Sequence, residues 1–297
     1  MSNFDTSYQE DLFTPLSNQV WDQSIKPELT VLVFSYNQAK YIEECINAVL
    51  QQRTNFRVEI IIHDDASTDE TQQVLRIYKS KYPELISLLI QDENQFNKNA
   101  DIYGPLHRLA RGQYIARCDG DDFWCDSLKL QKQVDFLKEC PDYDLSFHNA
   151  NIVNTIGEIL CESYIHESGL RDYSASELRE LKWGLIPLSS ACYRNVIREF
   201  PFGYMLVQNG DLFFSMLLGK YGGAKFQSEI RSYAYRQHEG NSWDLHSIDK
   251  KNQMLIESFL YIVAYFIGIG EIDTAKKITS SRLIPRLNEF INPNSSS

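Results

Sequence analysis

The chain has 297 residues, of which 43% are hydrophobic and 23% are charged, and these values are typical of a globular protein with a substantial core. Its formal net charge is −11, from 40 acidic and 29 basic residues. Polyanion binding requires a basic surface, so no nucleic-acid partner is expected. The first ten residues are polar and acidic, and the six cysteines form no CxxC pair, which predicts a cytoplasmic protein with free thiols.

Residues 1–26 show no sustained periodicity, and we interpret them as an N-terminal extension. From residue 29 onward, short apolar runs alternate with segments that repeat apolar residues at helical spacing. Strands are expected at residues 29–34, 58–62, 85–90 and from Tyr114. Strands that alternate with helices predict an α/β protein with a mostly parallel, doubly wound central sheet.

Three serines lie where further helices are expected to begin. Ser67 with Glu70, and Ser174 with Glu177, have the spacing of a capping box, and Ser127 precedes another helical pattern. The sequence therefore predicts N-caps at these three positions.

The second half of the chain is less regular. Strands are expected at residues 143–153 and 188–193, and a helix at residues 211–218. Residues 254–269 are apolar and helical, but they fall short of the roughly 20 apolar residues that a membrane span needs. We expect this C-terminal segment to pack on the body, to form a dimer or to contact a membrane surface.

Three carboxylates, Asp119, Asp121 and Asp122, lie within four positions directly after a strand. Ionised carboxylates this close repel one another unless a cation or a proton separates them. Mg²⁺ and Mn²⁺ prefer oxygen ligands and often use one or two carboxylates together with substrate phosphates. A divalent metal site is therefore expected, and a solvated acidic turn is the simpler alternative.

Two other kinds of acidic loop can be tested against the residues. A calcium loop of the EF-hand type would need Gly and Glu where Trp124 and Leu130 stand, so it is excluded. A phosphatase of the haloacid dehalogenase type would carry Thr or Val at the position of Phe123. That enzyme class stays as an alternative.

A second carboxylate centre, Asp64 and Asp65, follows the second expected strand. Ligands of open parallel sheets bind at the carboxyl ends of the strands, so this pair and the acidic cluster should share one crevice. A carboxylate there can accept a hydrogen bond from an imide N–H such as that of uracil. The two centres together describe a nucleoside diphosphate held at both ends, although Asp64 and Asp65 could also simply cap the next helix.

Residues 35–37 (SYN), 64–69 (DDASTD) and 119–122 (DGDD) resemble, in order and spacing, the nucleotide-binding half of family 2 glycosyltransferases of the GT-A fold. The resemblance resumes at residues 209–214 (NGDLFF) and 235–243 (YRQHEGNSW). It implies a Rossmann-like, mostly parallel sheet flanked by helices. The domains it implies are a catalytic domain at 27–244, with a nucleotide-binding half at 27–125 and an acceptor half at 126–244, and a helical C-terminal extension at 245–297.

The resemblance also implies roles for individual residues. Asp211 matches the family's general base. The donor would be bound by Phe34, Tyr36, Asp65, Asp119, Asp121 and Trp124. Mn²⁺ or Mg²⁺ would be held by Asp121 with Asp119 or Asp122, and by His238. The chain departs from many relatives at Gly210, where they carry Glu.

The function implied is metal-dependent, inverting transfer of one sugar from a UDP-sugar to a hydroxyl of a glycan or lipid-linked acceptor, in bacterial surface polysaccharide synthesis. No Gln-x-x-Arg-Trp motif of polymerising synthases is present. Peripheral contact with the inner face of the membrane, or a homodimer, would involve the C-terminal helices. The alternative is a catalytically silent relative that binds nucleotide or glycan.

Overall fold

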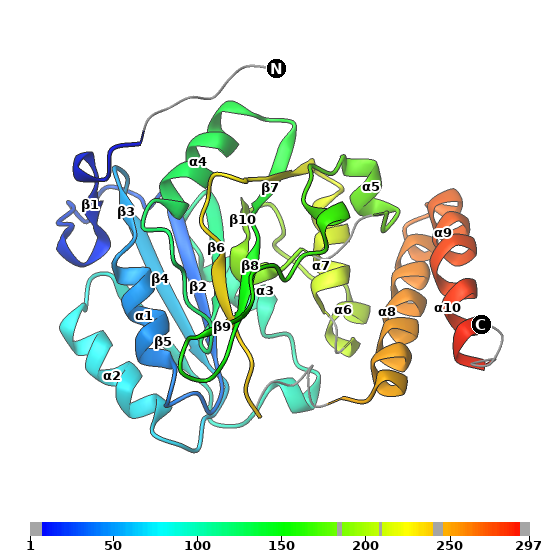
Figure 1. Cartoon of the computed structure of the whole chain (residues 1–297), viewed down its shortest axis with the longest axis horizontal. Coiled ribbons are helices and arrows are strands. Elements are labelled where there is room, and N and C mark those ends of the chain that lie inside the picture. Colours follow the sequence, from blue (N-terminus) through cyan, green and yellow to red (C-terminus); the bar gives the residue numbers. More distant parts are fainter. Residues whose placement is uncertain (1–7, 183–185, 208–209, 240–245, 292–297) are drawn as a thin grey trace.

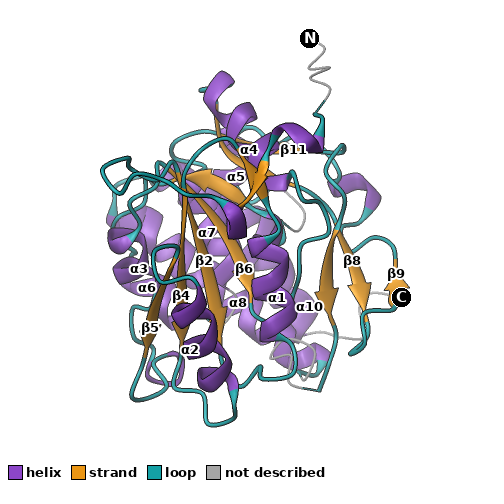
Figure 2. Cartoon of the chain, turned by 90° about the vertical axis from the view of Figure 1, so that its left-hand side faces the viewer, coloured by secondary structure: helices purple, strands orange, loops and turns teal. Residues whose placement is uncertain are grey.

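The computed structural model describes residues 8–182, 186–207, 210–239 and 246–291, and its centre is a seven-stranded sheet. The strands of this sheet are β2 Leu29–Ser35, β4 Val58–Asp64, β5 Ile86–Ile90, β6 Tyr114–Asp119, β7 Tyr143–Phe147, β10 Cys192–Arg194 and β11 Gly223–Phe226. Their order is β11-β7-β10-β6-β2-β4-β5, and only β10 is antiparallel to its neighbours. The expected mostly parallel α/β sheet is confirmed (Figure 2).

Helices cover both faces of the sheet because the side chains of each strand alternate between the faces. On β2, Leu29, Val31 and Val33 enter one apolar cluster, while Leu32 enters the other. The first cluster includes apolar residues of α1 Ile42–Leu50, α2 Thr71–Lys81 and α4 Lys129–Glu139. The second includes apolar residues of α3 Tyr103–Leu109, α5 Ala175–Arg179, α6 Phe202–Leu206 and α7 Gly210–Leu218. The sheet is therefore buried on both sides.

The C-terminal extension is helical, as expected, and lies beyond α7 on the second face (Figure 1). Its helices are α8 Ile248–Gly268, α9 Ile272–Ile278, the π-helical turn Thr279–Leu283 and α10 Ile284–Ile291. Phe259, Ile262 and Phe266 of α8 join the same apolar cluster as α7. Among the described helices, none combines the length and the apolar character that crossing a membrane demands.

Two small sheets complete the fold. The first pairs β1 Thr14–Pro15 with β3 Arg53–Thr54 and ties the described part of the N-terminal extension to the body. The second has the order β12-β8-β9. Its strands are β12 Tyr233–Arg236, β8 Ala150–Val153 and β9 Ile159–Cys161. A bridge between Phe123 and Ala234 places β12 against the acidic cluster.

Two predicted N-caps are wrong. The Ser67 hydroxyl donates instead to the buried carboxylate of Asp64, and α2 begins only at Thr71. The N-cap of α4 is Leu128, and the Ser127 hydroxyl donates to Glu10. In both places a nearby carboxylate competes for the hydroxyl on which the local sequence rule depends.

Two predicted strands also differ in detail. The segment expected to be one strand at residues 143–153 is divided into β7 and β8, which belong to different sheets. The segment at residues 188–193 starts as the 3₁₀ turn Leu188–Ser190 and becomes β10 only at Cys192. The third predicted N-cap, by contrast, is confirmed, because Ser174 and Glu177 make both reciprocal bonds of a capping box at the start of α5.

Replacing the confirmed cap should destabilise the protein. Ser174→Ala removes the acceptor of the Glu177 N–H, so we expect the free energy of unfolding to fall by about 1 kcal/mol in urea titration. Ser127→Ala is the matched control, with an expected change within about 0.5 kcal/mol because its hydroxyl caps no helix. Equal losses in the two variants would contradict this assignment.

Candidate functional site

The carboxyl ends of three adjacent strands bring the predicted site residues together. In the sheet register, Phe34 of β2 lies opposite His63 of β4 and opposite Asp119 of β6. Ser35 lies opposite Asp64. The two carboxylate centres predicted from the sequence therefore meet at one edge of the sheet, on either side of β2.

Gly120 lets the acidic cluster turn closely over the end of β2. Its N–H donates to the carbonyl oxygen of Phe34 at 2.8 Å. A Cβ built on Gly120 would lie 3.0 Å from that oxygen and 2.4 Å from Oε1 of Gln38, so a side chain would clash here. The glycine therefore fixes the position of the carboxylates that flank it.

The Asp119 carboxylate has two side-chain partners, the Ser189 hydroxyl and the Arg117 guanidinium. Its carboxylate accepts a hydrogen bond from the Ser189 hydroxyl at 3.2 Å and lies 3.4 Å from a terminal nitrogen of Arg117. Asp122 is buried, and its Oδ1 accepts the backbone N–H of Arg236 at 3.1 Å. Burial, with the charges of Asp121 and Asp119 nearby, holds the pKa of the Asp122 carboxyl well above its usual value. Asp122 thus joins the acidic cluster to β12.

Asp121 is paired with His238, which follows β12. Its Oδ2 lies 2.9 Å from Nε2 of the imidazole, and the ring of Tyr41 packs beside His238 with centroids 4.8 Å apart. Both side chains keep more than a tenth of their surface exposed, at 14% for Asp121 and 11% for His238. Asp121 and His238 therefore offer a partly accessible oxygen and nitrogen next to Asp119, whose side chain is 38% exposed.

Arg236 holds this arrangement in place. It is only 1% exposed, its Nε donates to the carbonyl oxygen of Asp121, and its terminal nitrogens donate to the carbonyls of Asn154 and Thr155 and to Glu44. One buried guanidinium thereby joins α1, the β8–β9 turn and the acidic cluster. The position of Asp121 relative to His238 depends on it.

Asp65 and Tyr36 lie on the other side of β2. The Asp65 carboxylate is buried and accepts the backbone N–H groups of Gln95 at 2.7 Å and Phe96 at 3.0 Å. A carboxylate has about four lone-pair sites, so two further bonds are open to it. Ala66, with φ of 62°, lies in the left-handed region that L-residues rarely adopt. Tyr36 is 45% exposed.

Trp124 does not face the crevice. It is 4% exposed, its indole N–H donates to the carbonyl of Ser189 at 2.7 Å, and the Lys129 ammonium lies 4.2 Å from its ring. Trp124 was expected to bind the sugar donor, but the structure places its side chain in the core beneath the acidic cluster.

Asp211 lies in the first turn of α7 and is partly buried. Burial raises the pKa of its carboxyl to about 6, with the Arg117 charge opposing the shift and the Asp119 charge adding to it. The charges of Arg117 and Asp119 both act on this carboxyl, so Asp211 is coupled electrostatically to the acidic cluster. A carboxylate with this pKa is suited to act as a general base near neutral pH.

Arg117 and Tyr103 were missed by the sequence reasoning. The Arg117 guanidinium stacks over the rings of Phe34 at 4.7 Å and Tyr103 at 5.3 Å, between the sheet edge and α3. The available signal was a charged residue within the apolar run of β6, because a charge is rarely buried without partners. Asn209 and residues 240–243 of the quoted motifs lie outside the described residues.

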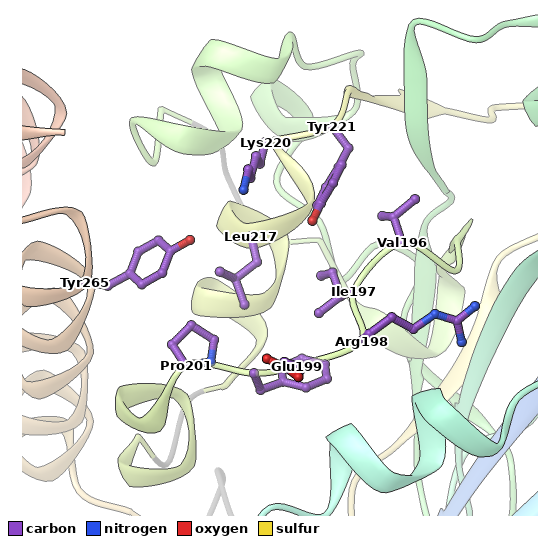
Figure 3. Close-up of a pocket in the computed structure, with 10 residues that line it drawn as sticks. Val196, Ile197, Arg198, Glu199, Pro201, Leu217, Lys220, Tyr221 and Tyr265 are labelled. Carbon is purple, nitrogen blue, oxygen red and sulfur yellow. The ribbon is translucent and has the colours of Figure 1, made fainter. Parts of the chain in front are cut away.

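A pocket of about 470 Å³ lies near the other end of α7 and contains none of the predicted site residues. Figure 3 shows Lys220 and Tyr221 at one side of it and Glu199 and Pro201 at the other. Phe200 lines the pocket and also packs against Tyr204, with ring centroids 4.8 Å apart. Because none of the predicted site residues lines it, the pocket is separate from the site at the strand ends.

Within the part of the chain that the structure describes, no three His, Cys, Asp or Glu side chains converge as a metal-binding group. Mg²⁺ and Mn²⁺ usually take one or two protein carboxylates and complete their coordination with waters and substrate phosphates. Asp121 and His238 offer two adjacent ligand atoms with some exposure, which fits a cation bound jointly by protein and substrate.

Comparison with known proteins gives a family match over residues 30–174, to the family described as "Glycosyl transferase family 2". An uncharacterized protein of Mycobacterium tuberculosis is 37% identical over 155 residues, which are 52% of this chain and 40% of that protein. The putative teichuronic acid biosynthesis glycosyltransferase TuaG of Bacillus subtilis is 38% identical over 114 residues, 38% of this chain and 43% of TuaG. These matches cover about two fifths of each relative's length.

Two kinds of solved structure share the fold. Residues 1–349 of Staphylococcus aureus TarS, in complex with UDP-GlcNAc, superpose with a TM-score of 0.59 at 17% identity, covering 90% of this chain and 74% of that one. The mannosyltransferase PcManGT of Pyrobaculum calidifontis, in complex with GDP-Man and Mn²⁺, gives a TM-score of 0.58 at 16% identity and covers 96% and 78%. The GT-A fold expected from the sequence is confirmed.

Removing the buried guanidinium should disrupt the acidic cluster. Arg236→Met leaves the carbonyls of Asp121, Asn154 and Thr155 without their donor, and we expect a loss of about 3 kcal/mol in the free energy of unfolding. Glu44→Gln, which changes only the exposed partner, should lose less than about 1 kcal/mol. Urea titration of both variants measures the difference, and similar losses would contradict a central role for Arg236.

Proposed function

Because residues 30–174 match the family described as "Glycosyl transferase family 2", we propose that this protein transfers a single sugar from a UDP-sugar to a hydroxyl of a glycan or lipid-linked acceptor. The observation that supports it most is the pairing of Asp121 with His238 and the position of Asp65 beside the end of β2, together with the raised pKa of Asp211, on which the charges of Arg117 and Asp119 act. Each group meets a different need of the reaction. In this proposal the catalytic unit comprises residues 27–244, with its nucleotide-binding half at 27–125.

The nucleoside would bind beside β2, between Phe34, Tyr36 and Asp65. A free lone pair of the Asp65 carboxylate would accept the imide N–H of uracil, in addition to the two backbone N–H groups that already orient it. TarS has been crystallised with UDP-GlcNAc and PcManGT with GDP-Man, which supports a nucleotide sugar as donor for this fold. The choice of uracil rests on Asp65.

The diphosphate would lie over the acidic cluster, where Asp121 and His238 fit a divalent cation, Mn²⁺ or Mg²⁺, and Asp119 lies beside them. A bound cation would offset the negative charge that develops on the leaving diphosphate. PcManGT holds Mn²⁺ in its complex. Asp122 would not be a ligand, because its buried carboxyl is committed to the backbone of Arg236.

Asp211 would remove the proton from the acceptor hydroxyl as its oxygen attacks the anomeric carbon. Attack from the face opposite the diphosphate inverts the configuration at that carbon. Asp211 lies on α7, whereas Asp121 follows β6 and His238 follows β12, so in this proposal the base and the groups that bind the diphosphate come from different elements. The Arg117 cation, which opposes the rise in the pKa of Asp211, favours the ionised form that can accept a proton.

The acceptor in this proposal belongs to a bacterial surface polysaccharide, in keeping with the biosynthetic role in TuaG's name. Exposed apolar residues on the C-terminal helices would contact the membrane that carries a lipid-linked acceptor, or a second copy of the chain. Those helices present Ile267, Ile272, Ile284 and Ile291 to solvent. A location at the inner face of the membrane follows from the same proposal.

The base assignment predicts loss of transfer without loss of donor binding. Asp211→Asn should lower kcat by about 10³-fold, the range expected for a general base, and leave the affinity for UDP nearly unchanged. In the unchanged protein, kcat should fall about tenfold per pH unit below pH 6, because protonation removes the base. Asp273→Asn on α9, whose carboxylate is 93% exposed, is the matched control. Normal turnover by Asp211→Asn would exclude this role.

The metal assignment predicts binding of UDP that depends on Mn²⁺. Isothermal calorimetry should show tighter UDP binding with Mn²⁺ than with EDTA, and Asp121→Ala and His238→Ala should each abolish the difference. A wild-type protein that binds UDP equally well under both conditions would refute the assignment. UDP binding without any turnover of UDP-sugars would favour the silent, ligand-binding alternative.

A further inference from the structure

Tyr204 on α6 has a buried hydroxyl without an assigned structural role. The residue is 2% exposed, and among the residues that the structure describes its hydroxyl oxygen has no hydrogen-bond partner. Buried polar atoms in native proteins almost always have a partner, either in the protein or in a bound water or ligand. The Tyr204 hydroxyl therefore has a hydrogen-bonding capacity that a bound water or a ligand could take up.

The ring of Tyr204 is held firmly by other aromatic side chains. Its centroid lies 4.8 Å from that of Phe200, 5.2 Å from that of Tyr103 and 5.8 Å from that of Phe213. Three aromatic neighbours restrict rotation of the ring, so the hydroxyl has a defined position. This position is determined by α6, α3 and α7 together.

The hydroxyl of Tyr204 is directed at the first turn of α7. A Cβ built on Gly210 would lie 3.3 Å from the hydroxyl oxygen and 3.4 Å from two ring carbons. Such contacts are tighter than those that most side chains make, so Gly210 leaves the room that the tyrosine occupies. Asp211, the proposed base, is the next residue along the chain.

The surroundings of this hydroxyl contain both donors and acceptors. The Arg117 guanidinium stacks on Tyr103, the ring that contacts Tyr204, and its Nε likewise has no partner within the described part of the chain. Arg117, Asp211 and Tyr103 all interact electrostatically with the Tyr204 hydroxyl. Two unpaired donors therefore lie on the side of the site where Asp211 is found. A sugar hydroxyl, whose oxygen accepts hydrogen bonds, matches them chemically.

We propose that Tyr204 is a specificity-determining residue, whose hydroxyl binds a hydroxyl group of the sugar that lies beside Asp211. The inference rests on the proposed function, since it concerns the same reacting sugars. Donor and acceptor sugars offer the same hydroxyl chemistry, and the kinetic measurements below distinguish them. Gly210 contributes to this arrangement, because a residue without a side chain leaves space for the Tyr204 hydroxyl.

Tyr204→Phe tests the proposal, because it keeps the ring and removes only the hydroxyl. Tyr173→Phe is the matched control: Tyr173 is 1% exposed, and its hydroxyl donates to the carbonyl of Gly169 at 2.9 Å. Tyr173→Phe should lower the Tm and leave kcat/KM unchanged. Tyr204→Phe should leave the Tm of the ligand-free protein unchanged or raised, because no internal bond is lost.

Kinetics are measured with UDP-glucose, UDP-N-acetylglucosamine and GDP-mannose in the presence of Mn²⁺, as hydrolysis without acceptor and as transfer to monosaccharide glycosides. In Tyr204→Phe, we expect kcat/KM to fall about tenfold, the size of one uncharged hydrogen bond. A rise in the donor KM, with slower hydrolysis, assigns the bond to the donor sugar. A rise only in the acceptor KM assigns it to the acceptor.

Two results would overturn the inference alone. Wild-type kinetic constants in Tyr204→Phe would show that the hydroxyl touches no substrate. A loss of Tm as large as that of Tyr173→Phe would show that the hydroxyl is bonded within the protein. If the wild-type protein turns over none of the three donors, the proposed function fails and the inference fails with it, so the two failures are distinguishable.

Discussion

Mutual repulsion among three carboxylates in four residues is the constraint on which the candidate site depends. The structure relieves it by sending each carboxylate in a different direction. Asp122 turns inward, where burial favours its protonated form and its Oδ1 accepts a hydrogen bond from the backbone N–H of Arg236. Asp119 turns toward Arg117, and Asp121 toward His238. Only Asp121 and Asp119 keep part of their surface exposed in the crevice.

This division explains why β12 belongs to the site although it lies in a different sheet. Arg236 on β12 binds the carbonyl of Asp121 through its side chain and the carboxylate of Asp122 through its backbone. The same strand then leads to His238, two residues later. The buried Arg236 guanidinium thus determines where the imidazole of His238 meets Asp121. Through Arg236, the small sheet β12-β8-β9 holds Asp121 and Asp122 in position.

Much of the fold and part of the site could be predicted because they depend on local patterns. The buried strands β2 and β4 are continuous apolar runs, and the carboxylates follow directly at their ends. Parallel strands then force Asp65 and Asp119 to one edge without further information. Asp211 could be proposed as the base only through resemblance, since nothing in the local sequence of α7 distinguishes it from any acidic residue in a first helical turn.

What could not be predicted involves partners that are distant in the chain. Ser67 satisfies a local capping rule, but the buried Asp64 carboxylate takes its hydroxyl because burial makes an unpaired charge more unfavourable than an uncapped helix. Arg117 and Arg236 pair with groups on other elements, and a one-dimensional pattern does not contain those distances. The same holds for Trp124, whose place in the core depends on the carbonyl of Ser189.

The ionisation of the proposed base, Asp211, shows the same dependence on distant residues. Burial favours the neutral carboxyl of Asp211, and the nearby negative charge of Asp119 adds to this effect. Arg117 opposes both effects, and its guanidinium is held over the rings of Phe34 on β2 and Tyr103 on α3. Phe34 belongs to the proposed nucleoside-binding side of the crevice. The packing of Phe34 against Arg117 therefore influences the protonation of the Asp211 carboxyl, because the Arg117 charge acts on that carboxyl.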